Sequence, residues 1–243
     1  MNPRITVATA HRVLQQLRHD KRTIALLLVA PCALTTILKY VFSGTDTFDR
    51  IGGPILGLFP LLCMFLVTSI AMLRERTSGT LERLLTTPMG KFDLLLGYAG
   101  AFAVAAVVQA TLESVVAFGL LDLHVDGDRW AVVLLAIANG LLGMALGLFV
   151  SAFAKSEFQA VQFMPAFVLP QILLCGLLIP RDEMAAVLEW LSTVLPLTYA
   201  YDALARATGD ELDTRLAVDV MIVAGAIVAA LVLGATTLRR RTP

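Results

Sequence analysis

The side chain best placed for unusual chemistry in this sequence is Glu113, because it interrupts an otherwise apolar run over residues 94–121. Gln109 lies one helical turn before it, so both side chains would share one face of a helix. A charged carboxylate at the centre of a bilayer costs roughly 3 kcal/mol or more, so Glu113 should face a protein interior or a water-filled cavity. Two hypotheses stay open. Gln109 and Glu113 line a substrate path, or a protonated Glu113 bonds a neighbouring helix for packing.

Motifs for covalent, metal or nucleotide chemistry do not occur in the sequence. The three histidines have no Cys, His or acidic partner at metal-ligand spacing on a helix. H-E-x-x-H, G-x-S-x-G and glycine-rich dinucleotide motifs are missing. The ATP-binding motif G-x-x-x-x-G-K-[ST] is approached only at Gly90 and Lys91, where Leu85 and Phe92 occupy two required positions. We therefore expect no catalytic, metal or cofactor site, and any ATP-driven work needs a separate subunit.

The segments that must position these residues are long and apolar. Apolar residues make up 58% of the 243 positions, and charged residues only 16%, against about a quarter in soluble domains. A helix needs ~20 apolar residues to cross a bilayer, where its backbone must be hydrogen-bonded internally. The sequence therefore predicts an all-α membrane protein, with one transmembrane domain over residues 1–243. We expect six spans, at about 23–42, 51–73, 94–121, 130–154, 158–180 and 216–238.

Lys and Arg residues predict the orientation of these spans. Thirteen of the nineteen lie in segments 1–22, 74–93, 155 and 239–241, which face one side if the spans alternate. Basic residues concentrate on the cytoplasmic side of membrane proteins. We therefore expect both termini in the cytoplasm and a multi-pass protein in the cytoplasmic membrane. The formal net charge is zero, which gives no basic surface for nucleic acid.

Three segments outside the spans have patterns of their own. Residues 5–20 place Val7, Ala10, Leu14 and Leu17 on one helical face, which predicts an amphipathic helix at the cytoplasmic interface. Residues 74–93 predict a short cytoplasmic helix whose exposed leucines need a partner. Residues 181–215 predict half-buried helices that re-enter the outer leaflet without crossing it.

A face of small residues in the fourth predicted span favours close helix packing. Gly143 and Gly147 are four positions apart, so both lie on the same side of the helix. We expect this face to pack within the chain rather than at a dimer interface.

The loop after the second predicted span carries the most specific pattern, a charged pair followed by G-T-L-E-R-L-L-T-T-P. It resembles the signature of the ABC-2 type permeases, the membrane subunits of bacterial ABC exporters. A second similarity is a P…P-x-T-Y stretch at Pro180, Pro196, Thr198 and Tyr199, which in the family belongs to outer re-entrant helices. Glu113 matches no motif of the family, so it inherits no role.

The resemblance implies a coupling helix in the loop, which docks in a groove of a separate ATPase subunit. The residues that would carry ATPase coupling are Arg74, Glu75, Arg76, Thr77, Gly79, Thr80, Leu81, Glu82, Arg83, Leu84, Leu85 and Pro88.

The resemblance also implies partners. It implies two ABC ATPase chains that bind ATP and Mg, a second permease that is identical or homologous, and surrounding membrane lipids. The chain is most similar to the drug and antibiotic resistance branch, such as the daunorubicin exporter subunit. Its implied function is export of a drug-like, lipid or glycolipid substrate across a bacterial cytoplasmic membrane. The alternatives are an ion-driven secondary transporter or channel subunit, which usually has several intramembrane charges, and an intramembrane enzyme.

Overall fold

The computed structural model describes residues 3–43, 47–78, 90–209 and 213–237, and all regular structure in them is helical. Five of the helices are long and apolar enough to cross a membrane. The helices are α1 (Pro3–His19), α2 (Lys21–Val41), α3 (Thr47–Thr77), α5 (Lys91–Gly119), α6 (Arg129–Val150), α7 (Glu157–Phe167), α8 (Leu169–Leu174), α9 (Ala186–Ser192), α10 (Pro196–Thr208) and α11 (Thr214–Thr237), with a 3₁₀ turn η1 (Arg181–Glu183).

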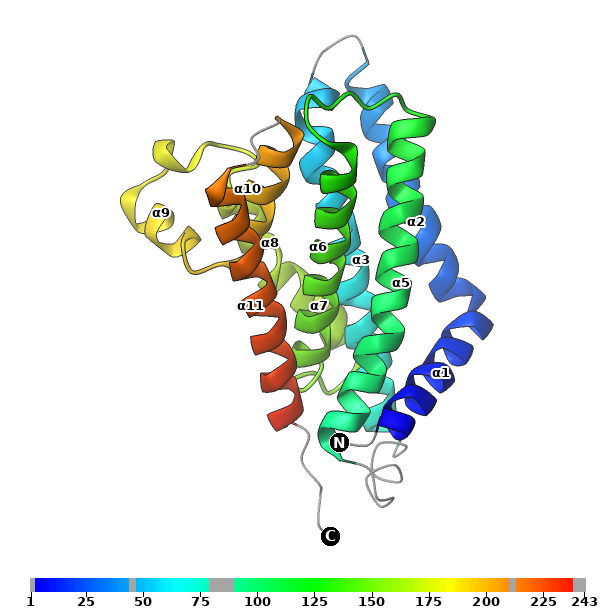
Figure 1. Cartoon of the computed structure of the whole chain (residues 1–243). Coiled ribbons are helices and arrows are strands. Elements are labelled where there is room, and N and C mark those ends of the chain that lie inside the picture. Colours follow the sequence, from blue (N-terminus) through cyan, green and yellow to red (C-terminus); the bar gives the residue numbers. More distant parts are fainter. Residues whose placement is uncertain (1–2, 44–46, 79–89, 210–212, 238–243) are drawn as a thin grey trace.

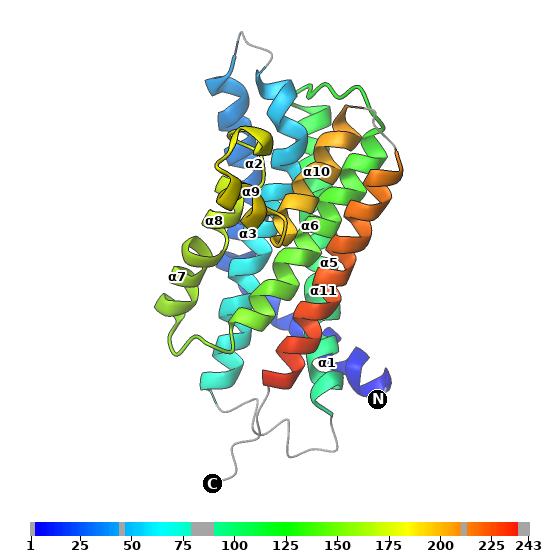
Figure 2. The same ribbon diagram turned by 90° about the vertical axis from the view of Figure 1, so that its left-hand side faces the viewer.

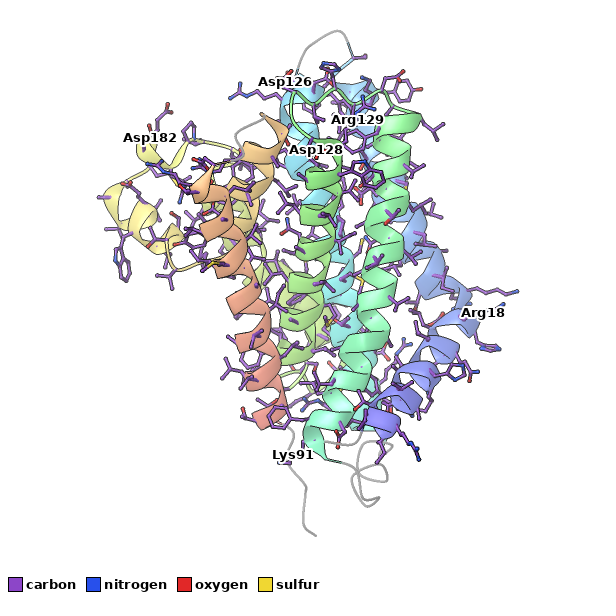
Figure 3. The ribbon with its side chains drawn as sticks, in the orientation of Figure 1. Arg18, Lys91, Asp126, Asp128, Arg129 and Asp182 are labelled. Atoms are coloured by element: carbon purple, nitrogen blue, oxygen red, sulfur yellow. The ribbon has the colours of Figure 1, made fainter. Side chains whose placement is uncertain are left out.

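The long helices α2, α3, α5, α6 and α11 form an upright bundle (Figure 1). They correspond to five of the six predicted spans, although α3 and α5 begin three or more residues earlier than predicted. The start of α1 and the end of α11 lie at the same end of the bundle, the lower end in Figure 1. Figure 3 shows Lys91 at that lower end and Asp126, Asp128 and Arg129 at the opposite, upper end.

The predicted span at 158–180 is not one continuous helix. It folds as α7 and the short helix α8, and the residues after Leu174 are not helical. The break between α7 and α8 comes at Val168, two residues before Pro170. A proline has no N–H to donate to the carbonyl four residues earlier, and its ring crowds that carbonyl. Gly176 has a φ of +100°, a conformation that commonly ends a helix. In Figure 2, α7, α8 and α9 follow one another up one side of the bundle.

Helix α3 lies at the centre of the bundle and is buried along most of its length. Its main neighbour is α6, and the two approach closely at two glycines of α6. A Cβ atom on Gly143 would collide with the backbone of Leu61, and one on Gly147 would collide with Thr68 and the carbonyl of Phe65. The predicted packing of this glycine face within the chain is therefore confirmed.

Helix α1 packs mainly against α5, at an angle to the bundle (Figure 1). Ala10, Leu14 and Leu17 contact the core as the apolar pattern predicted, and Val13 is buried with them. Val7 was expected on the same face but is 67% exposed. The packed face of α1 is thus rotated slightly from the predicted one.

The segment between α8 and α11 forms η1, α9 and α10 beside the upper half of the bundle (Figure 1). Asp182 lies at the upper edge of this segment in Figure 3. The side chain of Trp190 is exposed, whereas one face of α10 packs against α3, α6 and α11. In the orientation of Figure 1, the chain runs downward through α6, upward through α7 and α8, and downward again through α11.

Candidate functional site

The lower end of α3 leads into the predicted coupling loop, and two of its charged residues, Arg74 and Glu75, contact other helices. Arg74 donates hydrogen bonds from Nε and Nη2 to the two carboxylate oxygens of Glu157, at 2.8 and 3.2 Å. Its Nη1 lies 3.8 Å from Oδ2 of Asp20, the residue that caps α2. A two-pronged Arg–carboxylate contact fixes geometry as well as charge. Arg74 thus links the end of α3 to the starts of α7 and α2.

Glu75 points to a different pair of helices, because consecutive residues are turned by about 100° around a helix. Its Oε1 lies 3.6 Å from Nη2 of Arg12 on α1. Arg12 in turn donates a 2.6 Å hydrogen bond to the hydroxyl of Tyr98 on α5, and its guanidinium lies 5.7 Å from the centre of that ring. Arg74 and Glu75 together therefore connect the end of α3 to α1, α2, α5 and α7.

The two acids around Arg74 lie at the ends of helices and are held in their charged forms. The bond from Arg74 keeps the pKa of Glu157 below its ordinary value. The pKa of Asp20 is also lowered, first by the hydroxyl of Thr23, which donates to Oδ2 at 2.7 Å, and then by the Thr23 backbone N–H. The contacts of Arg74 with Glu157 and Asp20, and of Glu75 with Arg12 and through it Tyr98, form one set, the inner-end network.

The remaining predicted coupling residues are only partly described. Thr77 bonds back to the carbonyl of Leu73 within α3. The guanidinium of Arg76 is partly buried and makes no hydrogen bond through Nε or Nη2 to a described residue. Gly79, Thr80, Leu81, Glu82, Arg83, Leu84, Leu85 and Pro88 lie outside the described residues. The described chain resumes at Gly90, whose N–H donates to Asp93 at the start of α5.

Glu113 lies in the interior of the bundle. Its side chain is 0% exposed, and its Oε1 accepts a 3.0 Å hydrogen bond from the hydroxyl of Thr35 on α2. Its other oxygen and both polar atoms of Gln109 have no hydrogen-bond partner among the described residues. Neither residue lines either of two cavities, of about 740 and 400 Å³, among the described residues. The contact that Glu113 makes is therefore a bond between two helices, α5 and α2.

The P…P-x-T-Y residues fold the outer segment. Pro196 is the first residue of α10, where a missing N–H is tolerated. The hydroxyls of Thr198 and Tyr199 donate to the backbone carbonyls of Ser192 and Thr193, each at 2.7 Å. Both carbonyls belong to the end of α9, whose last carbonyl groups lack partners inside the helix. The pattern therefore joins the end of α9 to the start of α10.

Pro180 comes directly before η1 and places Arg181 toward α10. Arg181 contacts Asp202 on that helix at 2.5 Å. The Pro180 end of the motif is thus joined to α10 by charge, and the Pro196 end by hydroxyl groups.

Several partners of the predicted site residues could not be found from the sequence, because they lie far away along the chain. They are Arg12, Asp20, Thr35, Tyr98 and Glu157. For Arg12 alone the sequence contained an indication, because it lies on the polar face of the first predicted helix. Within the described residues, no three His, Cys, Asp or Glu side chains come together as a metal site would need.

Comparison with known proteins gives one family and several relatives. The family model described as "ABC-2 type transporter" matches residues 4–207. The "probable multidrug ABC transporter permease YbhR" of Escherichia coli is 27% identical over 139 residues, 57% of this chain and 38% of the relative. The "inner membrane transport permease YhhJ" of the same species is 26% identical over 166 residues, 66% of this chain and 44% of the relative.

A third relative is the "ABC transporter G family member 20" of Dictyostelium discoideum. It is 25% identical over 138 residues, which are 57% of this chain and 19% of the relative. The matched regions thus cover less than half of the length of each of these three proteins.

Proposed function

The chain belongs to the ABC-2 type transporter family, and from this premise we propose that it is the membrane-spanning permease subunit of an ABC exporter. A separate ATPase subunit would bind ATP and Mg and drive transport through the loop between α3 and α5. The chain is a multi-pass membrane protein, with five helices long and apolar enough to cross. We place it in the bacterial cytoplasmic membrane, with its lower end in the cytoplasm.

The inner-end network is the observation that carries this proposal. A docking loop can transmit force only if the helices that flank it are joined to the rest of the bundle. Arg74 and Glu75 contact three other helices through Asp20, Glu157 and Arg12, and Arg12 extends the network to a fourth, α5, by its bond to Tyr98. We propose that residues 74–88 form the ATPase-coupling element and that the network passes its movement to α1, α2, α5 and α7.

Six crossings fit this proposal if α7 and α8 together make the fifth. Residues 157–174 contain 18 residues, or roughly 27 Å of helix at 1.5 Å per residue. Broken helices are tolerated at membrane depth where protein covers the free backbone groups, and α7 contacts α3 while α8 contacts α10. The outer segment 181–215 would then re-enter from the outer surface, and both termini would be cytoplasmic.

For Glu113 the contacts support the packing hypothesis more than the path hypothesis. A residue that lines a path should face a cavity, whereas Glu113 is enclosed and bonded to Thr35. We propose that Gln109 and Glu113 hold α5 against its neighbours. If the substrate path runs between two permease chains, Gln109 and Glu113 would lie inside one chain and would not face the path.

The substrate class and the assembly are also proposals. Two relatives are named as a multidrug permease and a transport permease, which supports a drug-like substrate. A lipid or glycolipid substrate and outward movement are proposed from the family resemblance of the loop at residues 74–88. The complex would contain two ATPase chains and a second permease, identical or homologous. An ion-driven transporter or channel would need charged groups along a conduit. The buried acids of the described long helices are already engaged, Glu113 with Thr35, Asp93 with Gly90 and Asp219 with Arg206.

Co-purification tests the proposal directly. The chain is expressed with its genomic neighbours and isolated in mild detergent, and the proteins that stay bound are identified by mass spectrometry. We expect a stoichiometric ATPase that is lost when Glu82 and Arg83 are both changed to Ala. The matched control is Lys155→Ala, which removes a charge at the same end of the bundle, from the loop between α6 and α7.

Two outcomes would contradict the proposal. One is a chain that purifies alone and conducts ions or solute down a gradient in liposomes, which would favour the ion-driven alternative. The other is an ATPase that stays bound and drives full transport with the Glu82/Arg83 double variant, which would remove the coupling role of residues 74–88.

A further inference from the structure

A cavity of about 740 Å³ opens among α1, α2, α3 and α5 at the lower end of the bundle. Its volume lies within the usual range for ligand sites. Asp20, Arg22 and Leu26 line it from the start of α2, and Leu66, Ile70 and Glu75 from α3. Neither the coupling proposal nor the hydrogen bonds of the inner-end network account for a cavity of this size.

The wall of the cavity changes from polar to apolar with depth. Along α3 the lining runs from Glu75 at the helix end to Leu66, nine residues or about 13 Å deeper. Along α2 it runs from Arg22 to Leu26, one turn further into the bundle. On each helix the charged positions thus lie below the apolar ones, and α2 begins part-way up the bundle, near Arg18 in Figure 3. A molecule with a polar head and an apolar tail fits this order.

Two charged groups of this wall remain available to a ligand. Glu75 interacts with Arg12, 3.6 Å from its Oε1, and with the hydroxyl of Tyr98, whereas its buried Oε2 has no closely bonded donor among the described residues. A buried carboxylate oxygen without a donor is unfavourable, so a donor from a ligand would stabilise it. Arg22 lines the same cavity and makes no ion pair with a described residue, whereas Arg74 is engaged by Glu157.

We propose that this cavity binds a zwitterionic phospholipid with a primary amine in its head group, of the phosphatidylethanolamine class. The phosphate would pair with Arg22 and the ammonium with Glu75, while an acyl chain would lie along Leu26, Leu66 and Ile70. An anionic lipid fits less well, because the lining contains two acids, Asp20 and Glu75, beside its basic residues. The inference rests on the proposed function only in assigning this end of the bundle to the inner leaflet.

Native mass spectrometry of the purified complex tests this. Dioleoyl phosphatidylethanolamine is titrated against the corresponding phosphatidylglycerol, and the bound fraction of each is measured. Arg22→Gln should lower phosphatidylethanolamine binding about five-fold or more, and Lys21→Gln should leave it within two-fold. Both residues are exposed and adjacent, but Arg22 lines the cavity and Lys21 does not.

A second pair of variants tests the apolar part without disturbing the core. Leu26→Trp adds bulk at a cavity position that is 55% exposed, and Val29→Trp does so at a position 61% exposed outside the cavity. We expect Leu26→Trp to reduce binding and Val29→Trp to leave it unchanged. Glycerophosphoethanolamine, which has the head group but no acyl chains, should not compete at concentrations where the lipid saturates.

The proposal is overturned if phosphatidylglycerol binds as tightly, if both members of a variant pair behave alike, or if the soluble head group competes fully. ATPase co-purification is measured on the same samples, so the two proposals can fail separately. A chain that binds the lipid in this cavity but never retains an ATPase would contradict the exporter function and leave the lipid site standing.

Discussion

Arg74 and Glu157 are 83 positions apart in the sequence and are joined by two parallel hydrogen bonds of 2.8 and 3.2 Å. The contact connects the last turn of α3, which enters the predicted coupling loop, with the first residue of α7. Both side chains are 55% exposed, so the pair contributes little to the stability of the fold. The two parallel hydrogen bonds fix the orientation of α3 relative to α7. The pair is therefore suited to pass a movement of the loop from α3 to α7.

Removing or exchanging the charges of Arg74 and Glu157 should change the coupling of ATP hydrolysis to transport much more than the stability of the protein. Arg74→Gln and Glu157→Gln should each lower transport per ATP hydrolysed several-fold, while the thermal midpoint at pH 7 falls only slightly. The double variant Arg74→Glu/Glu157→Arg should recover part of the loss. Recovery should be incomplete because Glu at position 74 would face Asp20, now 3.8 Å from the guanidinium. Transport and ATPase activity in proteoliposomes measure this, and equal coupling in all four proteins would contradict it.

The inner-end network should lose stability only in acid. The pKa of Glu157 is lowered from an ordinary value of 4.5 by Arg74, and that of Asp20 from 3.8 by Thr23. A carboxylate with a lowered pKa in the folded state stabilises the fold above its ordinary pKa, and that contribution is lost as pH falls through the lowered value. The thermal midpoint in detergent should therefore be insensitive to these groups from pH 7 to 5 and decline below about 4.5. The thermal midpoint of Glu157→Gln should decline slightly less in acid than that of the original protein. An equal decline would show that Glu157 is not one of the groups responsible.

The contact between Thr35 and Glu113 should matter for packing. Thr35→Val removes the hydroxyl that donates to Glu113 and leaves a buried carboxyl group without that partner. We expect a loss of about 1–3 kcal/mol in stability. Thr36→Val is the matched control, because among the described residues the hydroxyl of Thr36 bonds only to the carbonyl of Cys32 in the same helix.

Glu113→Gln tests the path hypothesis for the same residue. The amide keeps the size of the side chain and can still accept from Thr35, so substrate-stimulated ATPase activity should stay close to normal. A changed stimulation with an unchanged thermal midpoint would support the path hypothesis instead.

The close contact of α6 with α3 should make Gly143 intolerant of a methyl group. A Cβ atom there meets the backbone of Leu61, which cannot rotate away as a side chain could. Gly143→Ala should therefore lower the thermal midpoint by several degrees. Gly225→Ala in α11 is the control, since no neighbouring atom of the described residues lies within 4 Å of its Cβ position. Alanine there improves helix propensity by up to about 1 kcal/mol. Equal effects of the two changes would contradict the packing of this face.

The sequence by itself determined the class of the protein and most of its helices. Apolar runs of 20 or more residues must be helical in lipid, because no water is present to satisfy the backbone. The spacing of Gly143 and Gly147 likewise predicted a close packing face, because small residues four apart always share one side of a helix. These properties depend on local composition and period alone.

The tertiary structure decided where apolar runs break. Pro54 and Pro60 lie inside the continuous helix α3, whereas the run at 158–180 is interrupted before Pro170 and ends near Gly176. Proline and glycine occur in both runs, so their presence could not distinguish a helix that continues from one that stops. The outcome depends on whether neighbouring helices cover the backbone groups that a proline leaves unpaired.

The tertiary structure also decided the partners of the charged residues. The sequence identified Arg74 and Glu75 as part of a motif, but not their partners. Asp20 and Glu157 lie 54 and 83 positions from Arg74, and Arg12 lies 63 positions from Glu75. Which side chains meet depends on the rotation and axial position of each helix in the bundle. A rotation by one residue, about 100°, would turn either side chain to another helix, and packing of the whole bundle is what fixes that angle.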